Sequence, residues 1–344
     1  KRKFIKIVKK NINFFLLVFF LYKFLINFIN PVAELNNIKK TFIIAEIGIN
    51  HEGSVIKCKK LIKIAAAAGA DAIKLQTVNV NESYDANTKS YNTFVKKDFS
   101  NKELKELKKF SEKSKVLFFS TPGDISSLHR LVKIGVRFIK ISSGLMNHYP
   151  LIKEAAKFKK SLIISTGLSN QRDLIELKNF FKKSKINNYA ILKCTSQYPA
   201  QNKNLNLRSL TYLKKLFKKT IGYSDHTKGL IAPVIAVSLG AKIIEKHITL
   251  NSKKKGADHK ISLEYLEFKK MVNLIRETET ITKDQKFFLP KELEKNRLIS
   301  RRYIFTKHKI KKGELFTIKN LCFKRINKKT NAMEPKTFFL INKR

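Results

Sequence analysis

The stretch FIIAEIGINHEGSVIKCKKLIKIAAAAGADAIKLQT (residues 42–77) contains one complete strand–helix–strand unit. Its first apolar run, FIIAE, ends at Glu46, and its last run, AIKLQT, carries Lys74 and Gln76. Between them, Ser54 can cap a helix that runs through LIKIAAAAGA, and Gly69 can end that helix. Two apolar runs separated by a helix of this length predict two parallel strands.

The same unit recurs along the chain, and each later run also carries charged or hydroxylated residues at one end. The six further runs are VLFFST (116–121), FIKISS (138–143), LIIST (162–166), AILKCTSQY (190–198), IGYSDH (221–226) and IIEKHIT (243–249). Eight strands that alternate with helices are typical of one α/β fold, the (β/α)8 TIM barrel. Because active sites of this fold lie at the carboxyl ends of the strands, the polar tips predict where the site is.

The chain is longer than one barrel. A barrel takes roughly 250 residues, and the sequence has 344. We predict the barrel over residues 41–280, a charged linker over 281–296, and a small β-rich domain over 297–344 that ends early. Short β-like runs around a Lys-Lys-Gly-Glu turn in RRYIFTKHKIKKGELFTIKNLCFKRI (301–326) indicate this last domain. Residues 79–97, polar and without clear periodicity, are expected to form an active-site loop.

Residues 1–40 form a basic and apolar N-terminal segment. Its apolar stretch, residues 14–29, is interrupted by Lys23 and Asn27, and it is shorter than the ~20 residues that span a bilayer. One interpretation is a weak membrane anchor. The other interpretations, which we favour, are a surface helix or an incorrectly assigned start of the reading frame.

The formal net charge is +46, from 72 Lys plus Arg against 26 Asp plus Glu. Such an excess often indicates a nucleic acid, an anionic membrane or an anionic substrate as partner. Because the lysines are dispersed and no helix-turn-helix or zinc-finger spacing occurs, we expect no nucleic-acid partner. The three cysteines are widely spaced, which indicates neither a disulfide framework nor a cysteine metal cage and favours a cytoplasmic location.

Two lysines, Lys74 and Lys140, lie within predicted strands. A lysine that points into a barrel is costly to bury unless an anion meets it. The two lysines could therefore hold a phosphate and a carboxylate together with strand-end hydroxyls. Alternatively, each lysine extends to the barrel rim or pairs with Glu46 or Glu245. The hydroxyl residues are Thr121, Ser143 and Ser165.

His226 follows the seventh predicted strand and His247 ends the eighth, and these strands are neighbours in a barrel. The two imidazoles can therefore converge on one divalent ion, and Zn, Mn, Fe and Co all accept imidazole ligands. Alternatively, both are structural histidines satisfied by hydrogen bonds.

Two carboxylates accompany these residues. Glu46 could orient or deprotonate a water molecule, provided that it reaches the reacting atom with a suitable pKa; otherwise it forms a salt bridge with Lys74. Asp258 follows the eighth strand in Gly-Ala-Asp-His. It could bind a sugar hydroxyl or the metal's water, or it could belong to an ordinary turn.

The order of short motifs along the chain resembles that of the sialic acid synthase family. The resemblance covers about residues 42–273, and the later strings RRYIF, KKGE and FKR resemble the family's C-terminal antifreeze-like (SAF) domain. Many independent matches in one fixed order are specific, unlike any single match. The motifs are AEIGINHEG (45–53), AIKLQT (72–77), FFSTPGD (118–124), KISSG (140–144), ISTGLSN (164–170), CTSQYP (194–199), IGYSDHT (221–227), AKIIEKHIT (241–249) and GADHKISL (256–263).

This resemblance implies an enzyme that condenses phosphoenolpyruvate with an N-acylhexosamine, typically N-acetylmannosamine. The products would be a nine-carbon 2-keto-3-deoxy acid, a sialic or related nonulosonic acid, and phosphate. It also implies a divalent metal on His226 and His247, Mn2+ before Mg2+ or Co2+, that polarises the aldehyde.

The resemblance assigns further roles residue by residue. Glu46 matches the residue that acts on the attacking water, and Lys74, Lys140 and Asp258 match the other catalytic positions. Arg325 matches an arginine that reaches into the partner's barrel in a domain-swapped homodimer, so we expect a homodimer. The other substrate-binding positions are matched by Gln76, Thr121, Ser143, Ser165, Ser196 and Tyr198.

This chain departs from the family pattern at Leu145, where Glu or Asp usually follows the Ser-Gly of the fourth strand. The substitution removes a carboxylate close to the sugar. One alternative is therefore a catalytically inactive barrel that binds a sugar or a partner. Another is a phosphosugar-using 3-deoxy-octulosonate-type synthase, which would not explain the SAF-like segment.

Overall fold

The computed structural model describes Leu35 and residues 38–256, 258–283, 286–327 and 331–341. The chain divides into two compact units, the first ending at Lys283 and the second beginning at Asp284. Most of the predicted N-terminal segment, residues 1–40, lies outside the described residues. Among the helices of the described ranges, none is both long enough and apolar enough to cross a membrane.

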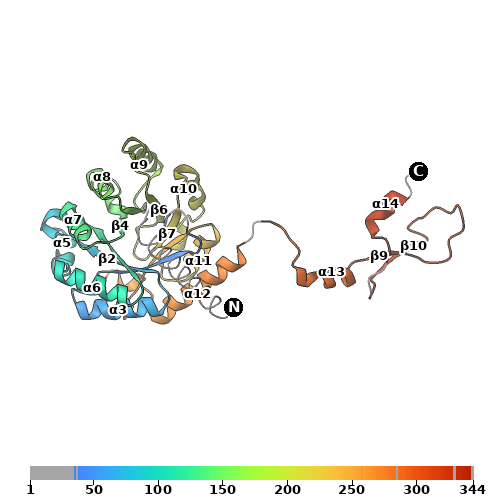
Figure 1. Ribbon diagram of the computed structural model, residues 1–344, viewed down its shortest axis with the longest axis horizontal. Helices are drawn as coiled ribbons and strands as arrows, with labels where there is room; N and C mark the ends of the chain where they lie inside the picture. Colours follow the sequence, from blue (N-terminus) through green and yellow to red (C-terminus); the bar gives the residue numbers. More distant parts are fainter. Residues whose placement is uncertain (1–34, 36–37, 257, 284–285, 328–330, 342–344) are drawn as a thin grey trace, which may run out of the picture. The chain divides into compact units, whose positions relative to one another are not determined.

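The first unit is a closed barrel of eight parallel strands, which confirms the predicted (β/α)8 fold (Figure 1). Each strand pairs with the next, and β1 pairs with β8 to close the sheet. Glu46 on β1 is in register with Lys74 on β2 and with His247 on β8. The strands are β1 (Phe42–Gly48), β2 (Ala72–Thr77), β3 (Leu117–Pro122), β4 (Phe138–Ile141), β5 (Ser161–Ser165), β6 (Tyr189–Cys194), β7 (Ile221–Asp225) and β8 (Ile243–His247).

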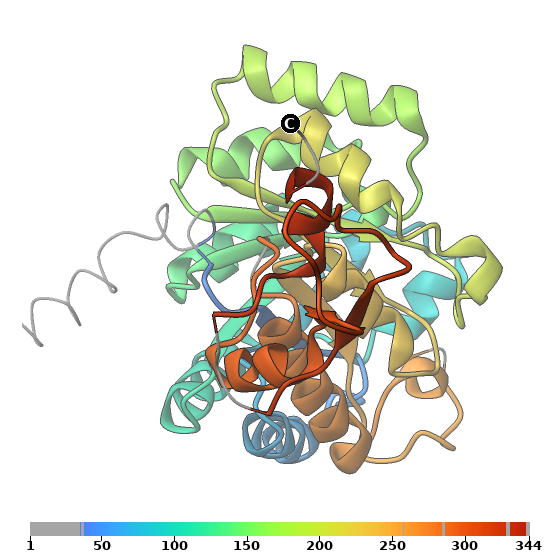
Figure 2. The same cartoon turned by 90° about the vertical axis from the view of Figure 1, so that its right-hand side faces the viewer.

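Helices surround the strands and can be followed by colour from blue to orange in Figures 1 and 2. The predicted cap of the first of them is confirmed, because the Ser54 side chain accepts a hydrogen bond from the Lys57 backbone N–H. The barrel helices are α3 (Val55–Ala67), α6 (Asn101–Lys113), α7 (Ile125–Lys133), α8 (Tyr149–Lys157), α9 (Gln171–Lys183), α10 (Ser209–Phe217), α11 (Ile231–Ser238) and α12 (Tyr265–Ile281).

Residues 79–97, which the sequence predicted as an active-site loop, also contain regular structure. They contain two short helices, α4 (Val80–Ser83) and α5 (Lys89–Phe94), each too short to show a helical period in the sequence. The Asp124 carboxylate, which caps α7, also accepts hydrogen bonds from the Asn79 backbone N–H at 2.8 Å and from Ser83 Oγ at 2.9 Å. This segment is therefore tied to the end of β3.

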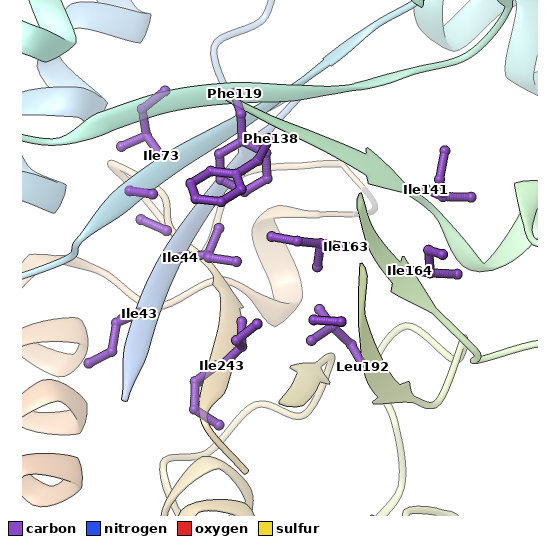
Figure 3. Close-up of a cluster of buried hydrophobic side chains, with 14 of the residues drawn as sticks. Ile43, Ile44, Ile73, Phe119, Phe138, Ile141, Ile163, Ile164, Leu192 and Ile243 are labelled. Carbon is purple, nitrogen blue, oxygen red and sulfur yellow. The ribbon is translucent and has the colours of Figure 1, made fainter. Parts of the chain in front are cut away.

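The barrel interior is built in layers. Figure 3 shows apolar side chains from different strands pointing toward one another, and the rings of Phe119 and Phe138 lie 5.8 Å apart. This layer consists of Ile44, Phe119, Phe138, Ile163, Leu192 and Ile243. Residues two positions further along a strand share its face. The next layer toward the carboxyl ends is therefore Glu46, Thr121, Lys140, Ser165, Cys194 and Glu245.

The described part of the second unit contains a two-stranded antiparallel sheet and short helices. Strands β9 (Tyr303–Thr306) and β10 (Leu321–Lys324) pair with Phe305 opposite Cys322. Helices α13 (Glu294–Ser300) and α14 (Phe338–Ile341) flank this sheet in sequence. The sheet lies where the sequence predicted the small β-rich domain.

Candidate functional site

A cavity of about 490 Å³ lies at the carboxyl ends of the barrel strands. Its volume is in the range of small-molecule sites. Of the predicted site residues in the barrel, all except Asp258 line this cavity. They are Glu46, Lys74, Gln76, Thr121, Lys140, Ser143, Ser165, Ser196, Tyr198, His226 and His247.

Two lysines and two carboxylates alternate at the floor of this cavity. Lys74 forms a short ion pair with Glu46, and its Nζ lies 3.9 Å from Glu245 Oε2. Lys140 Nζ lies 3.7 Å from Glu245 Oε1. All four side chains are buried. The lysines therefore pair with Glu46 and Glu245, which was the alternative prediction for them. Both lysines also line the cavity, where the first prediction placed an anion.

Hydroxyl groups orient the two ammonium groups. Lys74 Nζ donates to Thr121 Oγ1 at 3.1 Å, and Lys140 Nζ donates to Ser165 Oγ at 2.6 Å. Lys140 Nζ also donates to the Ile141 carbonyl at 3.2 Å. The predicted lysines and hydroxyls therefore come together from β2, β3, β4 and β5, where they can meet an anion.

The two carboxyl groups of the floor differ in their affinity for a proton. Burial raises the pKa of Glu46 to about 7, although the charge of Lys74 acts in the opposite direction. Burial also favours the neutral form of Glu245, but Lys140 and Lys74 outweigh it and lower the pKa of that carboxyl. Glu46 can therefore exchange a proton near neutral pH, as a general base must.

His226 and His247 converge as predicted, with their ring centroids 5.5 Å apart. His226 Nδ1 lies 2.9 Å from the Thr195 carbonyl, a contact that orients the ring and leaves Nε2 for another partner. His247 Nδ1 is buried without a hydrogen-bond partner and lies 3.9 Å from Asp258 Oδ2. The Tyr198 ring stacks on His226 at 4.2 Å.

These donors fit a divalent cation held by two imidazoles. Burial lowers the pKa of His247 well below its ordinary value, so the ring is neutral, which is the form that binds metals. Across the ranges that the structure describes, no three His, Cys, Asp or Glu side chains are arranged to hold a metal ion. The side chains therefore suit a cation whose remaining ligands are oxygens of solvent or substrate.

Gly48 allows Asp258 to approach the other site residues. Its φ is +54°, and a Cβ at this position would lie 3.0 Å from both Glu46 Oε1 and Asp258 Oδ2. The same Cβ would lie 3.5 Å from His247 Cε1. Asp258 thus reaches Glu46 and His247 across the end of β1, although it does not line the cavity.

Ser143 and Ser196 meet at a second glycine, Gly167. Ser143 Oγ accepts a hydrogen bond from the Gly167 N–H at 2.8 Å. A Cβ on Gly167 would lie only 2.3 Å from Ser196 Oγ and 2.9 Å from Cys194 Sγ. The missing side chain of Gly167 therefore leaves room for the predicted serines.

Several lining residues were not predicted as site residues. Glu245 was named only as a partner for lysines, although its spacing of two from His247 placed it on the same face. Ser83, Tyr84 and Phe94 lie within residues 79–97, which the sequence predicted as an active-site loop without naming single residues. Cys194 and Ser224 carried no comparable signal. Arg325 belongs to the second unit, where it follows β10 and is exposed, so its predicted contact with a barrel stays a prediction.

Known proteins match this chain over most of its length. The model of the NeuB family matches residues 61–287. The N,N'-diacetyllegionaminic acid synthase of Campylobacter jejuni is 38% identical over 316 residues, which cover 87% of this chain and 95% of that protein. The pseudaminic acid synthase of the same species is 36% identical over 305 residues, covering 84% and 88%. A crystal structure of N-acetylneuraminic acid synthetase from Leptospira borgpetersenii, in complex with citrate, has 35% identity and a TM-score of 0.73, covering 76% of this chain and 92% of that one.

Proposed function

Because this chain belongs to the NeuB family, we propose that it condenses phosphoenolpyruvate with an N-acylhexosamine to give a nonulosonic acid and phosphate. The observation that carries the proposal is the alternation of Lys74, Glu46, Glu245 and Lys140 beside two imidazoles in one cavity. Such a floor offers cations to an anionic substrate and a carboxylate for proton transfer.

Phosphoenolpyruvate would bind at Lys74 and Lys140. Its phosphate and carboxylate can form charge-assisted hydrogen bonds with the two ammonium groups, each of which also faces a carboxylate of the cavity floor. The hydroxyls of Thr121 and Ser165, which already contact these ammonium groups, lie within reach of the same anion. The buried setting strengthens each of these charge interactions, because little water screens them.

The acceptor sugar would bind toward β7 and β8. His226 and His247 would hold a divalent metal, for which we propose Mn2+. When bound, the metal supplies Lewis-acid polarisation of the aldehyde oxygen. Tyr198 is half-exposed and stacks on His226, so its ring and hydroxyl can hold the sugar at the cavity mouth.

The reaction would proceed by formation of one C–C bond and cleavage of one C–O bond. The enol carbon of phosphoenolpyruvate attacks the aldehyde carbon, and positive charge develops at C2. Glu46 takes a proton from the water that adds at C2, and that proton is passed to the oxygen of the former aldehyde. As the adduct collapses, the proton of the C2 hydroxyl passes to the departing phosphate and the bond between C2 and the phosphate oxygen breaks, which leaves the 2-keto acid.

We also propose a homodimer in which Arg325 reaches the partner's cavity. The second unit leaves several large apolar side chains exposed, and such surfaces mark interaction sites. They include Phe287, Leu315, Ile318 and Phe339. If these side chains were buried against a second copy, the polar residues of the second unit would lie close to that copy.

The synthase proposal is tested by following phosphate release from phosphoenolpyruvate with Mn2+ present. We expect release only when an N-acylhexosamine is added, and a product of the condensed mass. Phosphoenolpyruvate with 18O in its bridging oxygen should give labelled phosphate, since the C–O bond breaks. Release without a sugar, or none with any hexosamine, would contradict the proposal.

The dimer proposal is tested by mixing two inactive variants, His247→Ala and Arg325→Ala. Each copy lacks a different part of the site, so only a mixed dimer that joins the intact barrel to the intact arginine of the other copy regains activity. Activity that stays absent after co-refolding, with both variants folded, would count against the exchange.

A further inference from the structure

Lysines gather at the end of the barrel opposite to the cavity. Short connections lead there from the end of one helix into the next strand. Because the strands are parallel, these connections all lie at the amino-terminal end of the barrel. The segments that lead into β1, β3, β5, β6, β7 and β8 each contain at least one exposed lysine. One from each segment defines what we call the basic face: Lys40, Lys115, Lys159, Lys185, Lys218 and Lys242.

Four of these lysines have a backbone conformation that favours glycine. Each of the barrel helices α3 and α6 to α11 is followed, within two residues, by a residue with a positive φ. That residue is glycine after α3, α7 and α11, but lysine, with φ between +51° and +61°, after α6, α8, α9 and α10. A lysine near a helix C-terminus gains a small electrostatic stabilisation, yet glycine adopts this conformation at lower cost. The local structure therefore does not require lysine at these four positions.

The basic face has almost no carboxylates to neutralise it. Among the residues that the structure describes, its six lysines form no ion pair, whereas lysines on the helix flanks do, as Lys108 does with Glu112. Asp71 is the only acidic residue in the connections at this end. Its Oδ2 already accepts a hydrogen bond from Arg276 Nη2 at 3.3 Å. The charge of the face is therefore available to an external anion.

The opposite end of the barrel is different, because its cations lie among carboxylates. Glu52 pairs with both Lys57 and Lys254, and Asp98 pairs with Arg130. A general excess of lysine in the sequence would load both ends alike. Composition alone therefore does not account for the difference between the two ends.

The chain that precedes β1 reaches the barrel at the basic face. Leu35 is buried, and its carbonyl accepts a hydrogen bond from Thr220 Oγ1, immediately before β7. The sequence before Leu35 combines a basic start, residues 1–10, with the apolar stretch of residues 14–29. A nucleic acid would match the charges but not the apolar stretch, whereas an anionic bilayer offers partners to both.

We propose that the basic face binds the surface of a bilayer that contains anionic lipids. Lysines close to such a surface are attracted to it, and the attraction falls off within a Debye length, about 10 Å in about 0.1 M salt. The cavity lies at the other end of the barrel, so lipid bound at this face does not cover it. The inference is independent of the reaction proposed for the cavity.

The test measures co-sedimentation of the full chain with vesicles of phosphatidylglycerol and phosphatidylcholine. One variant replaces the four lysines of positive φ by asparagine, which tolerates this conformation and so preserves the fold. Each lysine near an anionic surface contributes about fivefold to the binding constant, so we expect binding to weaken on the order of 100- to 1000-fold. The substitutions are Lys115→Asn, Lys159→Asn, Lys185→Asn and Lys218→Asn.

The matched control removes the same charge from the opposite end of the barrel and should bind nearly as well as the unchanged protein. It replaces four exposed lysines: Lys203→Asn, Lys228→Asn, Lys253→Asn and Lys255→Asn. Urea unfolding checks that both variants are folded. Binding of the unchanged protein should also weaken as salt is added and be lost with vesicles of phosphatidylcholine alone.

Four outcomes would overturn the inference. They are no binding to the anionic vesicles, binding that does not depend on lipid charge, equal binding of the two folded variants, and binding to a short DNA duplex without binding to the vesicles. Equal binding of the variants would assign the attraction to residues before Leu35 or to charge spread over the whole surface. Binding to DNA alone would identify the partner as a nucleic acid.

Discussion

Lys246 and Asp225 form an ion pair in which both side chains are completely buried, with Lys246 Nζ 2.6 Å from Asp225 Oδ2. The two residues are in register between β7 and β8. Each immediately precedes an imidazole of the cavity, His226 or His247. Because Glu245 and His247 face the cavity, Lys246 faces the helices, so the pair joins the two strand ends from behind.

Replacing Lys246 by Met should strongly destabilise the barrel. The change leaves the Asp225 carboxylate buried without its cation, and breaking a buried pair in this way costs about 3–5 kcal/mol. Urea unfolding measures the loss. Lys228→Met is the matched control, because Lys228 is an exposed lysine three residues after Asp225, and such surface changes stay within about 0.5 kcal/mol. Equal stability of the two variants would contradict this account of the pair.

Gly48→Ala should impair activity more than its effect on stability explains. The added Cβ would meet Glu46 and Asp258 at 3.0 Å, so both carboxylates must move by a small distance. Because a misplacement of about 1 Å costs roughly 100-fold in activity, we expect this smaller shift to cost on the order of 10-fold. Gly135→Ala is the control, because Gly135 also has a positive φ, of +77°, yet its Cβ would meet nothing within 4 Å. Both variants share the backbone strain, so a similar loss of activity in both would reject crowding at the site.

Lys140→Met should weaken the use of phosphoenolpyruvate. It removes one of the two buried ammonium groups at the cavity floor, and loss of one such charge-stabilising donor lowers activity on the order of 100- to 1000-fold. Lys193→Met is the control, since Lys193 also lies in a strand but donates to the Cys194 carbonyl at 2.7 Å and does not line the cavity. Steady-state kinetics with varied phosphoenolpyruvate measures the effect, and the prediction fails if both lysines matter equally.

Stability should fall in mild acid because of His51. This side chain is completely buried, and burial, aided by the nearby charge of Lys97, lowers its pKa from 6.5 to about 4. The unfolded chain binds the proton near pH 6.5 and the native chain only near pH 4. The free energy of unfolding therefore has its full value above pH 6.5 and declines as the pH falls toward about 4. The difference between the two pKa values corresponds to roughly 3 kcal/mol of unfolding free energy.

Urea unfolding at several pH values between 7 and 4 measures this dependence. His51→Gln should flatten the curve over that window, because the titrating group is gone. His129→Gln, at an exposed histidine, should leave the slope as it is in the unchanged protein. An undiminished slope in His51→Gln would assign the acid sensitivity to other groups.

Much of the site was predictable because strand periodicity is local. The positions of Lys74, Lys140 and His247 at strand tips follow from apolar runs that can be counted along the chain, and barrel closure brings such tips together. The α4–α5 segment was predicted as an active-site loop, but its two helices were not predicted, because they are too short for a helical period to show. The segment that carries Tyr84 and Phe94 is held beside the end of β3 by the hydrogen bond from Ser83 to Asp124, which joins residues distant in sequence.

The sequence by itself determined the order of strands and helices, the end of the barrel that carries the chemistry, and the residue types available there. These depend on spacing within single segments. Only the tertiary structure decided which groups meet: that Glu46 contacts Lys74 while Glu245 lies between two lysines, and that Leu145 lines the same cavity. Such contacts join strands and loops far apart in the chain, so their distances, and the desolvation that shifts their pKa values, exist only once the barrel has closed.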